Sequence, residues 1–311
     1  MNELDLTIFY SAHGSSTIME IKNKLEKIYN KIITKKTIYT SIYRLEKQGL
    51  ITKKESGNRI IIQQTPMPIS SYLHNLIESY PHLIKKEFAK GKSLEILLTL
   101  LCNKCTVKLI SETIKSSDRN TIRYLTKFHK LALITKLDRE HSTNAYAWEI
   151  NKVNIELVKF LEAYEEFRAF RLLNSIDKNA ALIWLNGIEF LCKSQKIIRH
   201  ANFKKTGAEV LEKYGLKLLP SEKFYFYTNR KLNMWDHAFL TVLSRKQDPT
   251  QIRYLAYLYK KQKPNLSEFI SKGTYYDEHA MKCVIDLFSH KKETSELKFE
   301  DIKELEKMYG M

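Results

Sequence analysis

The sequence predicts a mostly α-helical protein with small β hairpins, because three observations agree. Glycine and proline are scarce, at 9 and 6 of 311 residues, which disfavours an all-β fold with many tight turns. Apolar residues recur at three- and four-residue spacing along most of the chain, as they do on the buried face of a helix. One pattern of helices and strands also occurs twice, 83 positions apart.

The first copy of this pattern is expected in residues 1–68. Helices are predicted at 4–12, 16–29 and 37–48, and the last ends at Gly49, a residue type that readily takes a positive φ. Two strands follow, separated by a Ser-Gly-Asn turn. Three helices and then a hairpin is the element order of a winged helix-turn-helix domain.

The second copy is expected in residues 93–150, with three helices and a longer hairpin. The entry into its first hairpin strand is a Leu-Ile-Thr-Lys sequence at 133–136, identical to the one at 50–53 in the first copy. A shift of 83 residues also aligns apolar positions, namely Ile42 with Leu125 and Leu45 with Phe128, and places Gly49 on Ala132. The repeat predicts two tandem winged helix-turn-helix domains.

The remaining segments complete the predicted domain organisation. Residues 69–92 are expected to form a linker helix and 151–174 a connecting helix, each serving dimerisation, domain contact or ordinary packing. Residues 175–311 are predicted to be a mainly helical α+β domain, in which the apolar segment around Gly187 is a strand or a helix and "EKFYFYTN" is a strand.

The charge of the chain favours a polyanionic partner. Lys and Arg number 52 against 35 Asp and Glu, a net charge of +17. Cations placed on phosphates release condensed counterions, so this excess favours nucleic acid. The alternative is that lysine serves only as a solubilising residue. The excess is +10 in residues 1–150 and +7 in the remainder, which indicates folded basic surfaces instead of a basic tail.

The cysteine content and hydropathy predict a cytoplasmic protein with no membrane partner. The chain has 4 cysteines and no signal peptide, as is usual in a reducing compartment. Its longest apolar run, "LEILLTLLC", is about half of the roughly 20 residues that a membrane-spanning helix needs.

The segment "TIYTSIYRLEKQGLI", residues 37–51, resembles the recognition helix and strand entry of winged-helix transcription factors of the PadR/MarR type. Residues 93–150 resemble the same superfamily more loosely. The resemblance implies that the third helix of each copy enters the major groove of double-stranded DNA, while the hairpin contacts the backbone or the minor groove.

The resemblance also implies a set of DNA-binding residues, on the helix face opposite Ile38, Ile42 and Leu45 and in the hairpins. In the first copy they are Lys35, Lys36, Thr37, Thr40 and Arg44 on the helix and Lys53, Lys54 and Arg59 in the hairpin. In the second copy they are Arg119, Asn120, Arg123 and Lys127 on the helix and Arg139 and His141 in the hairpin. Arg and Asn can read base edges, while Lys and Thr more often hold phosphates, so the second copy is expected to carry specificity.

Residues 175–311 faintly resemble the domains behind winged helices in abortive-infection antitoxins and degenerate nucleotidyltransferases. Active transferases of that kind have a Gly-Ser followed by a spaced pair of aspartates, and this sequence has none. If the fold is related, the catalytic residues have been lost.

No catalytic, metal-binding or cofactor-binding residue is predicted. Cys102-x-x-Cys105 is half of a zinc site without a matching pair, so buried structural thiols are favoured. Asp236 and His237 are adjacent and face different sides of a helix, which favours a capping or surface role. Tyr254 and Tyr257, beside lysines, fit a single-strand binder, but core packing is favoured.

These observations predict a sequence-specific DNA-binding protein, either a transcriptional regulator or an antitoxin-like repressor. The C-terminal domain would form a homodimer or bind a protein partner. The first alternative is a nuclease or nucleotidyltransferase-like enzyme with its centre in residues 175–311. The second is a protein-interaction scaffold that uses winged helices.

Overall fold

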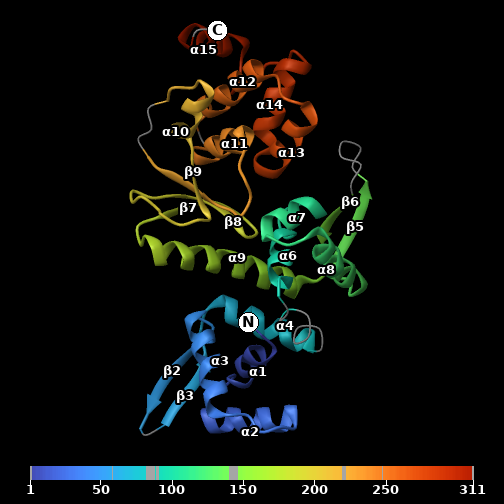
Figure 1. The fold of residues 1–311 in the computed structure, drawn as a ribbon, viewed down its shortest axis with the longest axis vertical. Coiled ribbons are helices and arrows are strands. Elements are labelled where there is room, and N and C mark those ends of the chain that lie inside the picture. The colour runs from blue at the N-terminus through green and yellow to red at the C-terminus, as the bar shows by residue number, and fades with distance from the viewer. Residues whose placement is uncertain are drawn as a thin grey trace. The chain divides into compact units, whose positions relative to one another are not determined.

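The computed structural model describes residues 2–57, 59–81, 88, 91–139, 146–218, 222–246 and 248–309. Helices dominate, and the strands form three small sheets (Figure 1), as predicted for a mostly α fold with small β elements. The chain divides into two compact units. Unit 1 comprises Met1–Leu101, Ile122–Thr135 and Ile150–Phe167, and unit 2 comprises Cys102–Thr121, Lys136–Glu149 and Arg168–Met311.

The N-terminal segment contains the predicted helices and hairpin, with one short strand added. Its elements are α1 (Glu3–Ser11), β1 (Ser16–Thr17), α2 (Ile18–Tyr29), α3 (Lys35–Lys47), β2 (Ile51–Ser56) and β3 (Arg59–Gln64). The two-residue strand β1 pairs antiparallel with β3, so the sheet has the order β1-β3-β2.

Side-chain caps explain where these helices begin. Asn2 and Asp5 form a capping box at α1, and Thr17 and Glu20 form another at α2, each satisfying amides that lack a helical partner. At α3 the Thr34 hydroxyl accepts from the amide three residues later. The caps therefore fix α2 and α3 as separate helices.

The second segment repeats this order. After α4 (Pro68–Ser79), its elements are α6 (Ser93–Thr99), β4 (Cys105–Thr106), α7 (Val107–Ile114), α8 (Asp118–Lys130), β5 (Ile134–Arg139) and β6 (Tyr146–Ile150). The sheet has the order β4-β6-β5, which is again first, third, second along the chain. A threonine, Thr106, caps α7 as Thr17 caps α2.

The turns that end α3 and α8 have the same geometry. Gly49 has a φ of 67°, and Ala132, 83 positions later, has a φ of 53°. The next residue, a leucine in both turns, donates its amide to the carbonyl five positions earlier, at 3.0 Å each time. This is the Schellman arrangement, and it directs both helices into their strands in the same way.

The linking helices lie close to their predicted ranges. The predicted linker 69–92 overlaps α4, which begins at Pro68, and the predicted connecting helix 151–174 overlaps α9 (Ile155–Ile176). The Tyr80 hydroxyl, just after α4, lies 3.2 Å from the Asn154 side-chain oxygen before α9. Dimerisation through either helix stays a prediction.

The C-terminal part contains a four-stranded antiparallel sheet with the order β7-β8-β10-β9. The apolar segment around Gly187 is two strands with the glycine between them. The strands are β7 (Ala181–Asn186), β8 (Glu189–Lys193), β9 (Phe203–Thr206) and β10 (Phe224–Tyr227). The helices are α10 (Ala208–Leu211), α11 (Met234–Ser244), α12 (Thr250–Gln262), α13 (Leu266–Tyr276), α14 (Glu278–Ser289) and α15 (Phe299–Tyr309).

This sheet separates two hydrophobic cores. Alternate residues of a strand face opposite sides, so Phe190 packs with Ala169 and Leu173 of α9. Leu191 and Phe226 instead face the helices after the sheet. Figure 1 shows α9 along one face and α11 on the other. The sheet is therefore covered on both faces.

Two smaller predictions have different outcomes. Tyr257 is fully buried, and Tyr254 packs against the same core, which confirms core packing. The interpretation of Cys102 as a buried thiol is wrong, because α6 ends at Thr99 and Cys102 lies exposed in the turn that follows. Cys105, in β4, is buried as expected.

Candidate nucleic-acid interface

Helix α3 presents a polar, cationic face to solvent. Its aliphatic residues, Ile38, Ile42 and Leu45, are completely buried, while four of the predicted contact residues are exposed. These four are Lys35, Lys36, Thr37 and Thr40. The Thr40 hydroxyl donates to the Lys36 carbonyl at 2.9 Å and the Thr37 hydroxyl lies 2.9 Å from that of Thr34, so both threonines are held in place.

Arg44, also predicted to contact DNA, is held by another helix. Its Nη2 donates to Asp5 Oδ1 at 2.7 Å and its Nε to Asp5 Oδ2 at 3.3 Å. The Asp5 side chain is 2% exposed and also caps α1, whereas the Arg44 side chain is 42% exposed. Arg44 therefore fastens α3 to α1, and only part of its guanidinium faces solvent.

Two tyrosines share the exposed face of α3 and are absent from the predicted set. Tyr39 is 44% exposed and Tyr43 is 60% exposed, although large aromatic residues usually contribute to a core. They lie three and seven residues after Lys36, which places them on one side of the helix. The sequence could have identified them, because their three- and four-residue spacing from Lys36 to Lys47 places them on the cationic side of the helix.

The first hairpin carries exposed cations on both strands. Lys54 on β2 and Arg59 on β3 are exposed, while Lys53 forms an ion pair with Glu46 of α3. Ser56 and Arg59 are partners in the register, so Arg59 lies at the tip of the hairpin. Lys54 and Arg59 can reach a phosphate more readily than Lys53, which is engaged.

Helix α8 presents arginines at the corresponding positions. Arg119 and Arg123 are exposed, and the Arg123 guanidinium lies 5.6 Å from the centre of the Tyr124 ring. Asn120 is half-buried, and its side-chain Nδ2 donates to the Ser116 hydroxyl at 2.9 Å. Lys127 is half-buried. The side chain of Arg139 and the whole of His141 lie outside the described residues.

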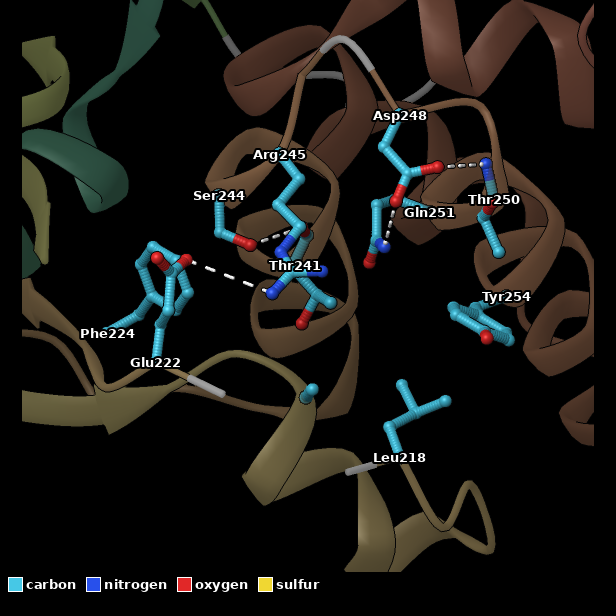
Figure 2. A pocket seen from close by; sticks show the side chains of 11 residues that line it. Leu218, Glu222, Phe224, Thr241, Ser244, Arg245, Asp248, Thr250, Gln251 and Tyr254 are labelled. Atoms are coloured by element: carbon cyan, nitrogen blue, oxygen red, sulfur yellow. Dashed lines mark hydrogen bonds and ion pairs between the residues drawn. The ribbon is translucent and has the colours of Figure 1, made fainter. Parts of the chain in front are cut away.

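The C-terminal part contains a small polar pocket of about 170 Å³, which Figure 2 shows between α11, α12 and β10. Its charged groups pair locally. Asp248 accepts from the Thr250 amide and the Gln251 side chain, both at 3.0 Å, and Arg245 lies 3.8 Å from Glu222. The volume is below the roughly 300 Å³ of small-molecule sites. This pocket is therefore a weak candidate for an effector site.

A buried ionic network joins β8, the segment after β10, α11 and α13. Glu189, which is 0% exposed, accepts from Arg230 at 2.9 and 2.6 Å and from the Tyr275 hydroxyl at 2.6 Å. Asp236 accepts from Lys272 at 2.7 Å and Tyr276 at 2.8 Å. Burial raises the pKa of both tyrosine hydroxyls well above its usual value, so they remain donors.

This network is suited to holding the fold together. Each carboxylate receives several donors, and the Asp236 carboxylate also accepts from the Asn233 amide at the start of α11, which confirms a capping role. A general base or a metal ligand needs an oxygen open to a reacting group. The arrangement therefore gives little support to a catalytic centre here.

The chain matches none of the protein-family models, curated proteins or solved structures with which it was compared. None of the described helices is long and apolar enough to cross a membrane. The arguments for function therefore come from the geometry of the two repeated segments and from the charge on their exposed faces.

Proposed function

We propose that this chain binds double-stranded DNA sequence-specifically through two winged helix-turn-helix modules, as a transcriptional regulator or an antitoxin-like repressor. α3 and α8 would enter the major groove, and the two hairpins would contact the backbone or the minor groove. The C-terminal part would supply dimerisation or bind a protein partner.

One observation carries the proposal. The two segments have the same element order and the same sheet order, and α3 and α8 end in the same turn. Each helix buries its apolar face and exposes cations, Lys35 and Lys36 on α3 and Arg119 and Arg123 on α8. A repeated scaffold with a cationic face on the same helix is what two DNA-reading modules require.

The residues divide into two roles within this proposal. Lys35, Lys36, Lys54 and Arg59 would hold phosphates. Arg119 and Arg123 would read base edges, because a guanidinium can donate two bonds to guanine. Arg44 is reassigned from DNA contact to holding α3 against α1, because its guanidinium makes two bonds to the buried Asp5 carboxylate.

A salt titration of duplex binding tests the proposal. The logarithm of the affinity should fall steeply with the logarithm of salt concentration. Lys35→Ala with Lys36→Ala should reduce that slope by roughly 2, about 1 for each phosphate that is no longer neutralised. A matched control is Lys178→Ala with Lys303→Ala, which removes the same charge from exposed sites outside both helices.

Selection of binding sites from random duplexes tests specificity. Arg123→Ala should relax the preference at one base pair, by about 1–3 kcal/mol, whereas Lys36→Ala should weaken all sequences alike. A shallow salt slope, or equal losses in the control variant, would contradict DNA binding and favour the protein-scaffold alternative.

A further inference from the structure

A histidine, a cysteine and a glutamate converge at α14. His279 and Cys283 are four residues apart, so both lie on one side of the helix. Glu296 comes from the segment between α14 and α15. His279 Nε2 lies 3.0 Å from Glu296 Oε2 and 3.7 Å from Cys283 Sγ. One atom from each side chain lies within 4.8 Å of the others.

We propose that His279, Cys283 and Glu296 form a binding site for a divalent transition metal of the Zn²⁺ class. Imidazole, thiolate and carboxylate are the donors that Zn²⁺ uses, with bond lengths of about 2.0–2.3 Å. A tetrahedral ion at these bond lengths separates its ligand atoms by roughly 3.3–3.6 Å. The observed nitrogen–oxygen and nitrogen–sulfur separations differ from these values by only a few tenths of an ångström.

The surroundings hold the three side chains in place. Cys283 is 3% exposed and packs in the core beneath α14. Glu296 lies in a turn where the Leu297 amide donates to the Thr294 hydroxyl at 3.1 Å and the Thr294 amide to the Leu297 carbonyl at 3.0 Å. Leu297 is fully buried and anchors this turn. Metal sites need such support to fix their ligands.

The fourth position of the ion would be open. His279 and Glu296 line a pocket of about 760 Å³, and their side chains are 68% and 39% exposed. A metal with three protein ligands and one open position keeps a water or another small ligand there. The neighbouring carboxylates have local partners, since Glu278 pairs with Lys282 and Asp277 caps α14.

A simple ion pair between His279 and Glu296 is the competing interpretation. Exposed pairs of this kind contribute little to stability. It involves only two of the three side chains, whereas a metal ligand set also uses the sulfur of Cys283 at 3.7 Å from the same imidazole nitrogen. The spacing of two ligands on a helix and a third 13 residues later is not a zinc-finger pattern, which explains why the sequence predicted no metal site.

Titration of the full chain with Co²⁺ tests the site, because a thiolate ligand produces a charge-transfer band. We expect one equivalent of Co²⁺ to bind and to produce that band. Zn²⁺ should displace the Co²⁺ and remove the band, whereas Mg²⁺ and Ca²⁺ should not. Cys283→Ser should abolish the band. His279→Ala and Glu296→Gln change side chains that are 68% and 39% exposed, so both variants should fold, and each should weaken binding by about tenfold or more.

Two controls make the outcome decisive. His290→Ala removes an exposed histidine just after α14, and Cys102→Ser removes the exposed cysteine of the C-x-x-C pair. Both should leave Co²⁺ binding unchanged. Absence of the band in the native chain, or a band that survives Cys283→Ser, overturns the proposal. Loss of the band in Cys102→Ser would place the metal at the C-x-x-C pair instead.

Discussion

At the scale of single residues, the bond between Arg44 and Asp5 shows that a cation on a candidate recognition helix can serve the fold. Arg44→Ala leaves the buried Asp5 carboxylate without its charged partner, although Asp5 still accepts from the Asn2 amide. We expect the free energy of unfolding to fall by about 2–3 kcal/mol, as measured by urea denaturation. Lys36→Ala, on the same helix but exposed, should change stability little.

A different pattern would refute this assignment. If Arg44→Ala unfolds at the same urea concentration as the native chain but binds DNA far more weakly, Arg44 belongs to the interface.

His237 is the residue whose titration should be visible in stability. Its Nδ1 lies 3.0 Å from the Thr206 hydroxyl. Burial lowers its pKa, Asp236 raises it and Lys213 lowers it, so the pKa in the folded protein is below 6.5. The unfolded chain therefore binds the proton first as pH falls, and stability decreases from about pH 6.5 downward.

Urea unfolding of the native chain and of His237→Gln at pH 7.5 and 5.5 measures this effect. The variant should lose less stability between the two pH values. His290→Gln, at an exposed site, serves as the control and should retain the native pH dependence. Parallel behaviour of His237→Gln and the native chain would argue against the assignment.

At the scale of elements, the repeated turn after α3 and α8 predicts opposite effects at equivalent positions. Gly49→Ala places a Cβ at positive φ and 2.8 Å from the Phe167 ring, so it should destabilise by more than about 1 kcal/mol. Ala132→Gly relieves a positive φ at an exposed site and should stabilise by roughly 1 kcal/mol. Thermal unfolding of both variants measures the signs, and two changes of the same sign would contradict the equivalence.

The buried network in the C-terminal part gives the fourth prediction. Arg230→Met leaves Glu189 buried without its charged partner and should cost about 3–5 kcal/mol. Adding Glu189→Leu should recover part of that loss, because both charges are then gone. A double variant that loses the sum of the two single effects would show that the pair is not coupled.

Local signals explain which elements could be predicted. Thr34 caps α3, the Ser117 hydroxyl accepts from the Asn120 backbone amide at the start of α8, and both helices have apolar periodicity, so both could be predicted and both are found. The strands β1 and β4 have two residues each, and they exist because distant strands pair with them. No local pattern identifies so short a strand, so the sequence did not predict them.

Of the candidate site, the sequence predicted only which residues lie on the exposed face of a single helix. Exposure of Lys36 and Thr40 follows from the burial of Ile38 and Ile42, which the periodicity shows. The bond from Arg44 to Asp5 joins residues 39 positions apart, and the contact of His279 with Glu296 depends on a turn. Contacts of this kind need tertiary structure.

At the scale of the whole molecule, the proposed pair of DNA-binding modules predicts an effect of duplex length. A second module that binds the same duplex acts at a high effective concentration and can raise affinity by about 10²-fold or more. The native chain should therefore bind a duplex of several helical turns far more tightly than a duplex of one turn.

Fluorescence anisotropy with the two duplexes measures this difference. The Arg119→Ala and Arg123→Ala variant should lose the length advantage, whereas the Lys178→Ala and Lys303→Ala control should keep it. Equal affinity of the native chain for both duplexes would show that only one module binds at a time.

The shared turn after α3 and α8 has a consequence for engineering. That turn is formed by backbone hydrogen bonds and one residue of positive φ. The solvent-facing side chains of each helix can therefore be changed without altering the turn. Lys36→Arg, Thr37→Asn and Thr40→Arg would place the residue types of Arg119, Asn120 and Arg123 at the equivalent positions of α3. If the proposed function holds, a chain altered in this way would carry the same three base-reading residue types on both helices, and its preferred target should shift toward two copies of one half-site.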